Sequence, residues 1–324
     1  MKFNTKCIHG GGKPDSTGAI SPAIYMSSTF THPGLGETTG FQYTRESNPT
    51  RDRLETLIAG LEEGTDAIAF SSGMAAVDAV FHLFSPGDHV ILGDDLYGGS
   101  IRLFTNIYEK NGVEFTYVGT SDLDAVQAAF KPNTKAVYIE TPTNPMMEIT
   151  DVRALSKMAH DRNALVIVDN TFLSPYFQKP LHLGADIVVH SGTKFISGHH
   201  DVISGFTIVK DDELAAQLRL IYKTVGACLS AFDSWLVIRG IKTLALRMEQ
   251  HQKNAIALAE WLKQEPKVTK VLFPGLPEHP GYEVNKSQTT GFGGMLSFEV
   301  DSEETAKQVG SSPGTSPGSA SICT

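Results

Sequence analysis

A regular alternation of short apolar runs and amphipathic stretches begins near residue 51 and dominates the first two thirds of the chain. The apolar runs predict strands at 67–70, 89–93, 113–118, 136–140, 165–169, 186–190 and 205–209. The stretches between them carry helical patterns at about 51–61, 73–85, 100–111, 121–130 and 151–162. Strands that alternate with helices indicate a mostly parallel sheet, and strands that are apolar throughout are typical of a sheet covered on both faces. The sequence therefore predicts an α/β fold.

The two ends of the chain follow other patterns. Gly and Pro residues interrupt every candidate helix in residues 1–45, which predicts an irregular arm that packs on the body or on another subunit. A helical pattern at about 230–264 leads to two further predicted strands, at 270–273 and 294–300. We therefore expect four segments: an arm (1–45), a main domain (46–245), a partial C-terminal domain (246–309) and a disordered Ser/Pro/Gly tail (310–324).

Charge and cysteine content narrow the classes of function. A net charge of −9 and a pI near 5.6 give no reason to expect a nucleic acid or an anionic membrane as partner. The three cysteines are far apart, and His199–His200–Asp201 has no third strong ligand beside it, so neither a disulfide framework nor a metal site is predicted. The N-terminus is too polar for a signal peptide, and no apolar run approaches the roughly 18 residues of a membrane span. We expect a cytoplasmic protein.

Several predicted strands are followed by residues that could bind a ligand at the carboxyl edge of the sheet. Gly73 and Met74 open a helix after strand 67–70, where free backbone N–H groups suit a phosphate, although small polar residues at a helix start are usually a simple cap. Tyr97 precedes two glycines and could approach a flat ligand or pack in a turn, and Asn144 lies in a polar, Pro-rich loop. By contrast, Glu62–Glu63 and residues 211–213 are interpreted as solvated helix faces and turns.

An acid and an amine follow two neighbouring strands. Strand 165–169 ends in Asp169, and strand 186–190 is followed by Ser191, Gly192, Thr193 and Lys194. The connection is long enough for a crossover, so the strands are expected to be parallel, with both side chains at one edge. A structural ion pair between Asp169 and Lys194 is one interpretation.

The other interpretation is a site for pyridoxal 5′-phosphate (PLP). A PLP enzyme needs a lysine for the aldehyde and a carboxylate for the pyridine nitrogen. It also needs phosphate donors and an aromatic side chain against the ring. Each kind of group follows a strand of the same predicted sheet. An NAD-linked alternative is disfavoured because no GxGxxG pattern follows an early strand.

Longer motifs around these residues resemble the Cys/Met-metabolism family of PLP enzymes. That family includes cystathionine γ-synthase, cystathionine β- and γ-lyases and methionine γ-lyase. The resemblance covers about residues 5–300. It rests on YTRESNPT (43–50), SSGMAA (71–76), DDLYGGS (94–100), ETPTNP (140–145), VDNTF (168–172), HSGTKFISGH (190–199) and DSWLVIRGIKTLALRM (233–248).

The resemblance implies a role for each candidate residue. Lys194 would hold PLP as a Schiff base, Asp169 would pair with the pyridine nitrogen and Tyr97 would stack on the ring. The phosphate would be bound by Gly73, Met74, Ser191 and Thr193, with Tyr43 and Arg45 reaching it from a neighbouring subunit, and Asn144 would contact the substrate or the ring oxygen. The implied fold is type I, like aspartate aminotransferase, assembled as a tetramer of two catalytic dimers. The implied activity is a C–S lyase on cystathionine-like amino acids, with cystathionine γ-synthase as the alternative.

Two features depart from the family pattern. Gly99 stands where methionine γ-lyases carry a cysteine, which argues against that activity. The resemblance also fades near residue 309, where the Ser/Pro/Gly tail begins. From this ending we expect a truncated or frame-shifted product, and one hypothesis is therefore a chain that binds PLP but is impaired in turnover.

Overall fold

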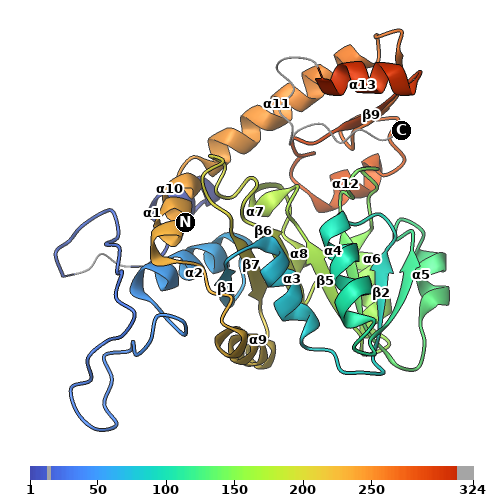
Figure 1. Cartoon of the computed structure of the whole chain (residues 1–324). Helices are drawn as coiled ribbons and strands as arrows, with labels where there is room; N and C mark the ends of the chain where they lie inside the picture. Colours follow the sequence, from blue (N-terminus) through green and yellow to red (C-terminus); the bar gives the residue numbers. More distant parts are fainter. Residues whose placement is uncertain (13–15, 312–324) are drawn as a thin grey trace.

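The structure, a computed structural model, describes residues 1–12 and 16–311 and is built around a seven-stranded sheet (Figure 1). The strand order is β1-β7-β6-β5-β4-β2-β3. The strands are β1 (Asp66–Phe70), β2 (His89–Gly93), β3 (Glu114–Val118), β4 (Thr134–Glu140), β5 (Leu165–Asp169), β6 (Ile187–Ser191) and β7 (Gly205–Val209). Neighbours from β3 to β6 pair in parallel, whereas β7 runs antiparallel to both β1 and β6. The α/β prediction and the parallel pairing of β5 with β6 are confirmed.

Helices cover both faces of this sheet, which is why the strands are apolar throughout. One face packs against α3 (Gly73–Phe81), α4 (Gly98–Leu103) and α9 (Asp212–Val225). The other face packs against α2 (Pro49–Glu62) and α6 (Val152–His160). Because side chains alternate along a strand, odd-numbered residues of β5 and β6 face α3, and even-numbered ones face α2.

Most predicted helices are present, including α5 (Leu123–Ala129), and the predicted helix at 100–111 is α4 followed by a π-helical turn, Phe104–Tyr108. The expectation that residues 1–45 hold no helix is wrong at the start, because α1 (Phe3–His9) forms and buries Cys7 against α2. The acidic residues 211–213 are exposed, but they open α9: the Asp211 side chain accepts the Leu214 N–H at 2.8 Å. Four further helices are α7 (Ser174–Phe177), α8 (Pro180–Leu183), α12 (Tyr282–Gln288) and α13 (Glu303–Ser311).

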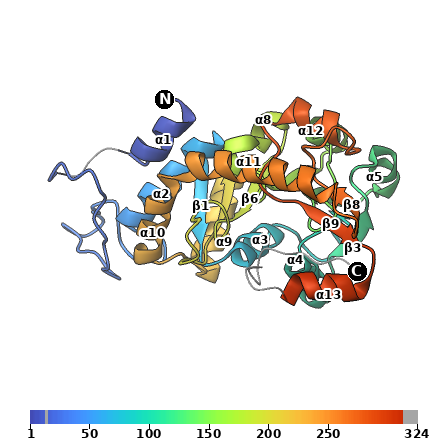
Figure 2. The ribbon, with the colours of Figure 1, turned by 90° about the horizontal axis from the view of Figure 1, so that it is seen from above.

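The predicted long helix is two helices, α10 (Ala231–Ile241) and α11 (Leu244–Leu262). Figure 2 shows α11 running from the sheet toward a second, two-stranded antiparallel sheet of β8 (Val268–Leu272) and β9 (Ser297–Val300). Of the tail predicted at 310–324, residues 312–324 lie outside the described residues. Within residues 1–12 and 16–311, no helix is long and apolar enough to cross a membrane.

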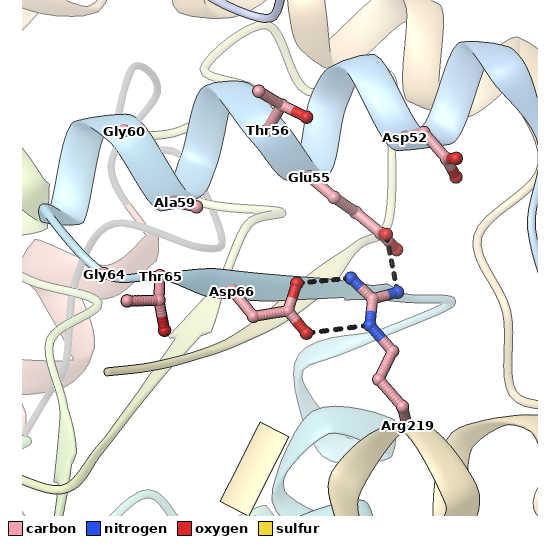
Figure 3. Close-up of a pocket in the computed structure, with 9 residues that line it drawn as sticks. All are labelled: Asp52, Glu55, Thr56, Ala59, Gly60, Gly64, Thr65, Asp66 and Arg219. Atoms are coloured by element: carbon pink, nitrogen blue, oxygen red, sulfur yellow. Dashed lines mark hydrogen bonds and ion pairs between the residues drawn. The ribbon is translucent and has the colours of Figure 1, made fainter. Parts of the chain in front are cut away.

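A pocket of about 420 Å³ opens between α2 and the amino-terminal end of β1 (Figure 3). The Arg219 guanidinium fills its polar side, with Nη1 2.7 Å from Glu55 and two nitrogens 2.8 and 2.6 Å from the Asp66 carboxylate. Glu55 is buried, so these bonds compensate a charge that would otherwise be costly. The pocket lies at the opposite edge of the sheet from the strand-end residues described next.

Candidate active site

The carboxyl ends of β4, β5 and β6 bring two acids and the Lys194 turn to one edge of the sheet. Glu140 and Asp169, the last residues of β4 and β5, are register partners, and Asp169 is in turn the partner of Val189 in β6. Ser191 ends β6, and its N–H donates to the Thr171 hydroxyl at 2.8 Å. The parallel register therefore places the polar residues that end β4, β5 and β6 next to one another at one edge of the sheet.

The first turn of α3 packs directly against Ser191. A Cβ atom built on Gly73 would lie 2.9 Å from Ser191 Cβ and 3.0 Å from its Oγ, so residue 73 has no room for a side chain. The Ser72 hydroxyl accepts the Ala75 N–H at 3.0 Å and caps the helix, which agrees with the plainer interpretation of this segment. Capping and a phosphate cradle are compatible here, because Gly73 and the half-buried Met74 lie at the helix N-terminus beside a serine hydroxyl.

Lys194 lies at the end of a turn that Thr193 holds in place. The Thr193 hydroxyl accepts the Ser204 N–H at 3.0 Å, and the Thr193 N–H donates to the Ser204 carbonyl at 3.2 Å. The Lys194 side chain is exposed, and it has no hydrogen bond or ion pair with any residue that the structure describes. An ion pair with Asp169, the alternative interpretation of these two residues, is not formed.

Asp169 is a half-buried acid without an ion-pair partner among the described residues. Its Oδ1 accepts the Thr171 N–H at 2.9 Å and its Oδ2 lies 3.5 Å from the Tyr138 hydroxyl, but it forms no ion pair within the described part of the chain. Burial raises the pKa of Asp169, and this outweighs hydrogen bonds from Thr171 and the charge of His190, which lower it. An uncompensated carboxylate, a free lysine and a serine-lined helix start are the groups that PLP requires, so the residues present fit this cofactor.

Glu140 was not predicted as a site residue, although it begins the ETPTNP motif. It is almost fully buried, and its Oε2 accepts the Tyr97 backbone N–H at 3.0 Å. Burial and the neighbouring charge of Asp169 raise the pKa of Glu140 well above its ordinary value. The Tyr97 ring is half-exposed and lies over Gly99: a Cβ at position 99 would be 2.3 Å from Tyr97 Cε1. A cysteine at that position would therefore displace the ring.

The remaining candidates lie in two loops. The Arg45 guanidinium is 5.3 Å from the centre of the Tyr43 ring and donates to the Lys223 carbonyl near the end of α9. Among the described residues, neither side chain is hydrogen-bonded or ion-paired to Asp169 or Lys194. Asn144 is half-buried and precedes the cis peptide bond to Pro145.

One interpretation of the sequence is wrong in a way that affects the site. Glu62 is fully buried rather than solvated, and its Oε1 lies 2.6 Å from His190 Nε2. His190 directly precedes Ser191 and points to the opposite face of the sheet, toward α2. The even number of His190 places it on the face of β6 that packs against α2, and this was a signal in the sequence for the contact. The signal was missed because two consecutive glutamates near a helix end resemble a solvated face.

The substitution Glu140→Gln is expected to stabilise the cofactor-free protein at neutral pH. The pKa of Glu140 in the folded state is raised above its ordinary value of 4.5. Its contribution to stability is therefore fully present below pH 4.5 and is lost as the pH rises through the folded-state pKa. Gln cannot ionise and can still accept the Tyr97 N–H. Thermal unfolding should therefore show a Tm a few degrees above the parent at pH 7.5 and no difference near pH 4.

Glu114→Gln, at an exposed position of β3, is the matched control and should leave Tm unchanged at both pH values. A Glu140→Gln effect that is the same at pH 4 and pH 7.5 would contradict the assignment of a buried, neutral acid.

Comparison with known proteins agrees with this geometry. Residues 4–313 match the family described as Cys/Met metabolism PLP-dependent enzyme. The chain is 50% identical over 306 residues to cystathionine beta-lyase of Lactococcus lactis subsp. cremoris (strain MG1363), covering 94% of this chain and 80% of the relative. It is 48% identical over 307 residues to cystathionine gamma-synthase of Mycobacterium bovis (strain ATCC BAA-935 / AF2122/97), covering 94% and 79%. The solved structure of cystathionine gamma-lyase from Lactobacillus plantarum complexed with L-serine is 49% identical, with a TM-score of 0.91 over 93% of this chain and 79% of that one. The chain belongs to the Cys/Met-metabolism family of PLP-dependent enzymes.

Proposed function

We propose that this chain is a PLP-dependent C–S lyase that acts on cystathionine-like sulfur amino acids. The observation that carries the proposal is that Lys194, whose side chain has no hydrogen bond among the described residues, and the half-buried Asp169, which has no ion-pair partner there, lie at the same edge of the sheet. The proposal is supported by relatives of about 50% identity that include a cystathionine beta-lyase and a cystathionine gamma-lyase.

Each candidate residue has a place in holding the cofactor. Lys194 would carry the aldehyde, Asp169 would face the pyridine nitrogen and Tyr97 would cover the ring. The phosphate would lie among Gly73, Met74, Ser191 and Thr193, and Asn144 would contact the ring oxygen or the substrate. PLP, when bound, supplies an electron-withdrawing ring that stabilises negative charge at the substrate Cα.

The chain's own residues would then handle charge and protons. Lys194 Nζ would take the Cα proton of the substrate and return it to another atom of the substrate. Asp169 supplies the negative charge that keeps the pyridine nitrogen protonated, and the cation in turn compensates its burial. Tyr97 is half-exposed, and its hydroxyl would be available as a second acid or base.

We also propose that the active protein is a homotetramer of two dimers that share active sites. Residues 16–47 extend from the body as a long loop (Figure 1) and expose Ile20, Met26 and Leu35, an apolar surface that a second copy would cover. Tyr43 and Arg45 would reach the phosphate of the neighbouring subunit. Cys7 and Cys228, the cysteines within residues 1–12 and 16–311, form no disulfide, which supports a reducing, cytoplasmic location.

Cystathionine γ-synthase is the second candidate, favoured by the 48% identity to the Mycobacterium bovis enzyme. One assay separates these activities. PLP-loaded protein is incubated with cystathionine: pyruvate identifies β-elimination and 2-oxobutyrate identifies γ-elimination. Formation of cystathionine from an O-acylhomoserine and cysteine, without either oxo acid, would identify the synthase. The lyase proposal fails if cystathionine yields no oxo acid, and binding of PLP without any turnover would identify an impaired enzyme.

Replacement of Gly73 tests the phosphate cradle. A Cβ at this position would be 2.9–3.0 Å from Ser191, so Gly73→Ala must push the first turn of α3 away from the serine. We expect a Kd for PLP at least about 10-fold weaker, which corresponds to roughly 1.4 kcal/mol. The measurement is a titration of the cofactor-free protein followed by visible absorbance.

Gly60→Ala is the matched control, because a Cβ on this glycine of α2 meets nothing within 4 Å. Equal PLP affinities for Gly73→Ala and Gly60→Ala would argue that α3 does not bind the phosphate.

A further inference from the structure

Four polar residues form a fully enclosed cluster beneath the sheet, on the face opposite Asp169. Glu62, Asn170 and His190 have no exposed surface, and Gln178 is only 1% exposed. Glu62 is the last residue of α2, and His190 projects toward it from β6. Groups of this polarity are rarely buried without a purpose, since each must replace its lost hydrogen bonds to water.

Glu62 is the centre of the cluster. Its Oε1 lies 2.6 Å from His190 Nε2 and accepts the Asn170 side-chain N–H at 2.9 Å. Gln178 Nε2 donates to Asn170 Oδ1 at 3.1 Å, and the backbone carbonyl of Gln178 accepts from Asn170 Nδ2 at 3.1 Å. Hydrogen bonds from two buried donors to one carboxylate oxygen are charge-assisted and therefore strong.

The cluster reaches the tips of three strands that carry the site. Asn170 follows Asp169, and its N–H donates to the Val189 carbonyl at 2.9 Å. His190 precedes Ser191 in β6. Gln178 Nε2 lies 3.4 Å from the carbonyl of Thr141, the residue after Glu140. The cluster therefore joins the ends of β4, β5 and β6 from the side away from the cofactor.

The charges around the Glu62–His190 pair are few. Lys179 lies beside it, donating to the Leu61 carbonyl, and burial lowers the pKa of Lys179 while Glu62 and Glu63 raise it. Asp169 lies on the opposite face of the sheet, at the end of the neighbouring strand β5, and the charge of His190 lowers its pKa. Two buried atoms, Glu62 Oε2 and His190 Nδ1, have no hydrogen-bond partner among the described residues. The Glu62–His190 contact therefore lies one residue from Ser191 along β6, on the face of the sheet opposite Asp169.

We propose that Glu62 and His190 are a pair of positioning residues, which hold Asp169 and the Ser191–Lys194 turn in place for the cofactor. The inference rests on the proposed PLP site. Glu62 would hold the His190 ring in place through their hydrogen bond, and loss of the His190 charge would raise the pKa of Asp169 further. Neither side chain would touch the cofactor or the substrate.

The test uses two substitutions that keep the hydrogen bond and remove the charge. Gln at position 62 can still accept from His190, and Gln at position 190 can still donate to Glu62. In titrations of the cofactor-free protein with PLP, we expect Glu62→Gln and His190→Gln each to weaken the Kd for PLP about 10-fold at pH 6. Without the His190 charge, the pKa of Asp169 is higher, so a larger fraction of Asp169 is protonated at pH 6 than at pH 8. The loss of PLP affinity should therefore be smaller at pH 8. The double substitution should cost no more than either single one, since both break the same pair.

His89→Gln is the matched control. His89 is also a fully buried strand histidine, bonded to the Thr134 and Thr116 hydroxyls at 2.8 Å, but it lies at the start of β2, away from the site. The His89→Gln substitution should lower Tm without changing the Kd for PLP at pH 6 or pH 8.

Three results would overturn the proposal: PLP affinities equal to the parent, a loss of affinity that is the same at pH 6 and pH 8, or variants without folded structure by circular dichroism, which would show a purely structural role. These results differ from a failure of the proposed function, in which the parent protein itself does not bind PLP.

Discussion

The site depends on one constraint: Asp169 lies half-buried at the tip of a parallel strand without an ion-pair partner among the described residues. Burial raises its pKa, and hydrogen bonds from Thr171 offset only part of that effect. The register of β4 and β5 adds a second acid, Glu140, next to it. A buried and a half-buried acid side by side oppose folding at neutral pH, so the arrangement is costly unless a cationic group of a ligand lies between the strand ends.

The rest of the architecture brings the cofactor-binding groups around that acid. The α3 helix packs against Ser191 closely enough to exclude a side chain at Gly73, and the Thr193–Ser204 bonds fix the turn that presents Lys194. On the opposite face, the Glu62–His190 contact supports the same strand tips. The site is thus held from both faces of the sheet, whereas its lysine is left unbonded and exposed.

The sequence was sufficient to predict the seven strands and the residues at their ends, because continuous apolar runs mark buried parallel strands and polar residues directly after them must lie at one edge. It was not sufficient for Glu62 or Glu140. Whether a glutamate is buried depends on which face of a helix or strand meets its neighbour, and a single sequence does not contain that pairing. The α9 helix was missed for a related reason: its acidic start resembles a turn until Asp211 is seen capping it. The α1 helix gains stability by packing on α2, which local Gly and Pro content does not reveal.

The most direct test of the account is to locate the covalent attachment of PLP. The protein is loaded with PLP, reduced with borohydride and digested, and the modified peptide is identified by mass spectrometry. The account predicts a single pyridoxyl group on Lys194, and no stable adduct on that peptide in Lys194→Ala. Modification at another lysine, or a protein that shows no visible cofactor band and is unchanged by borohydride, would contradict it.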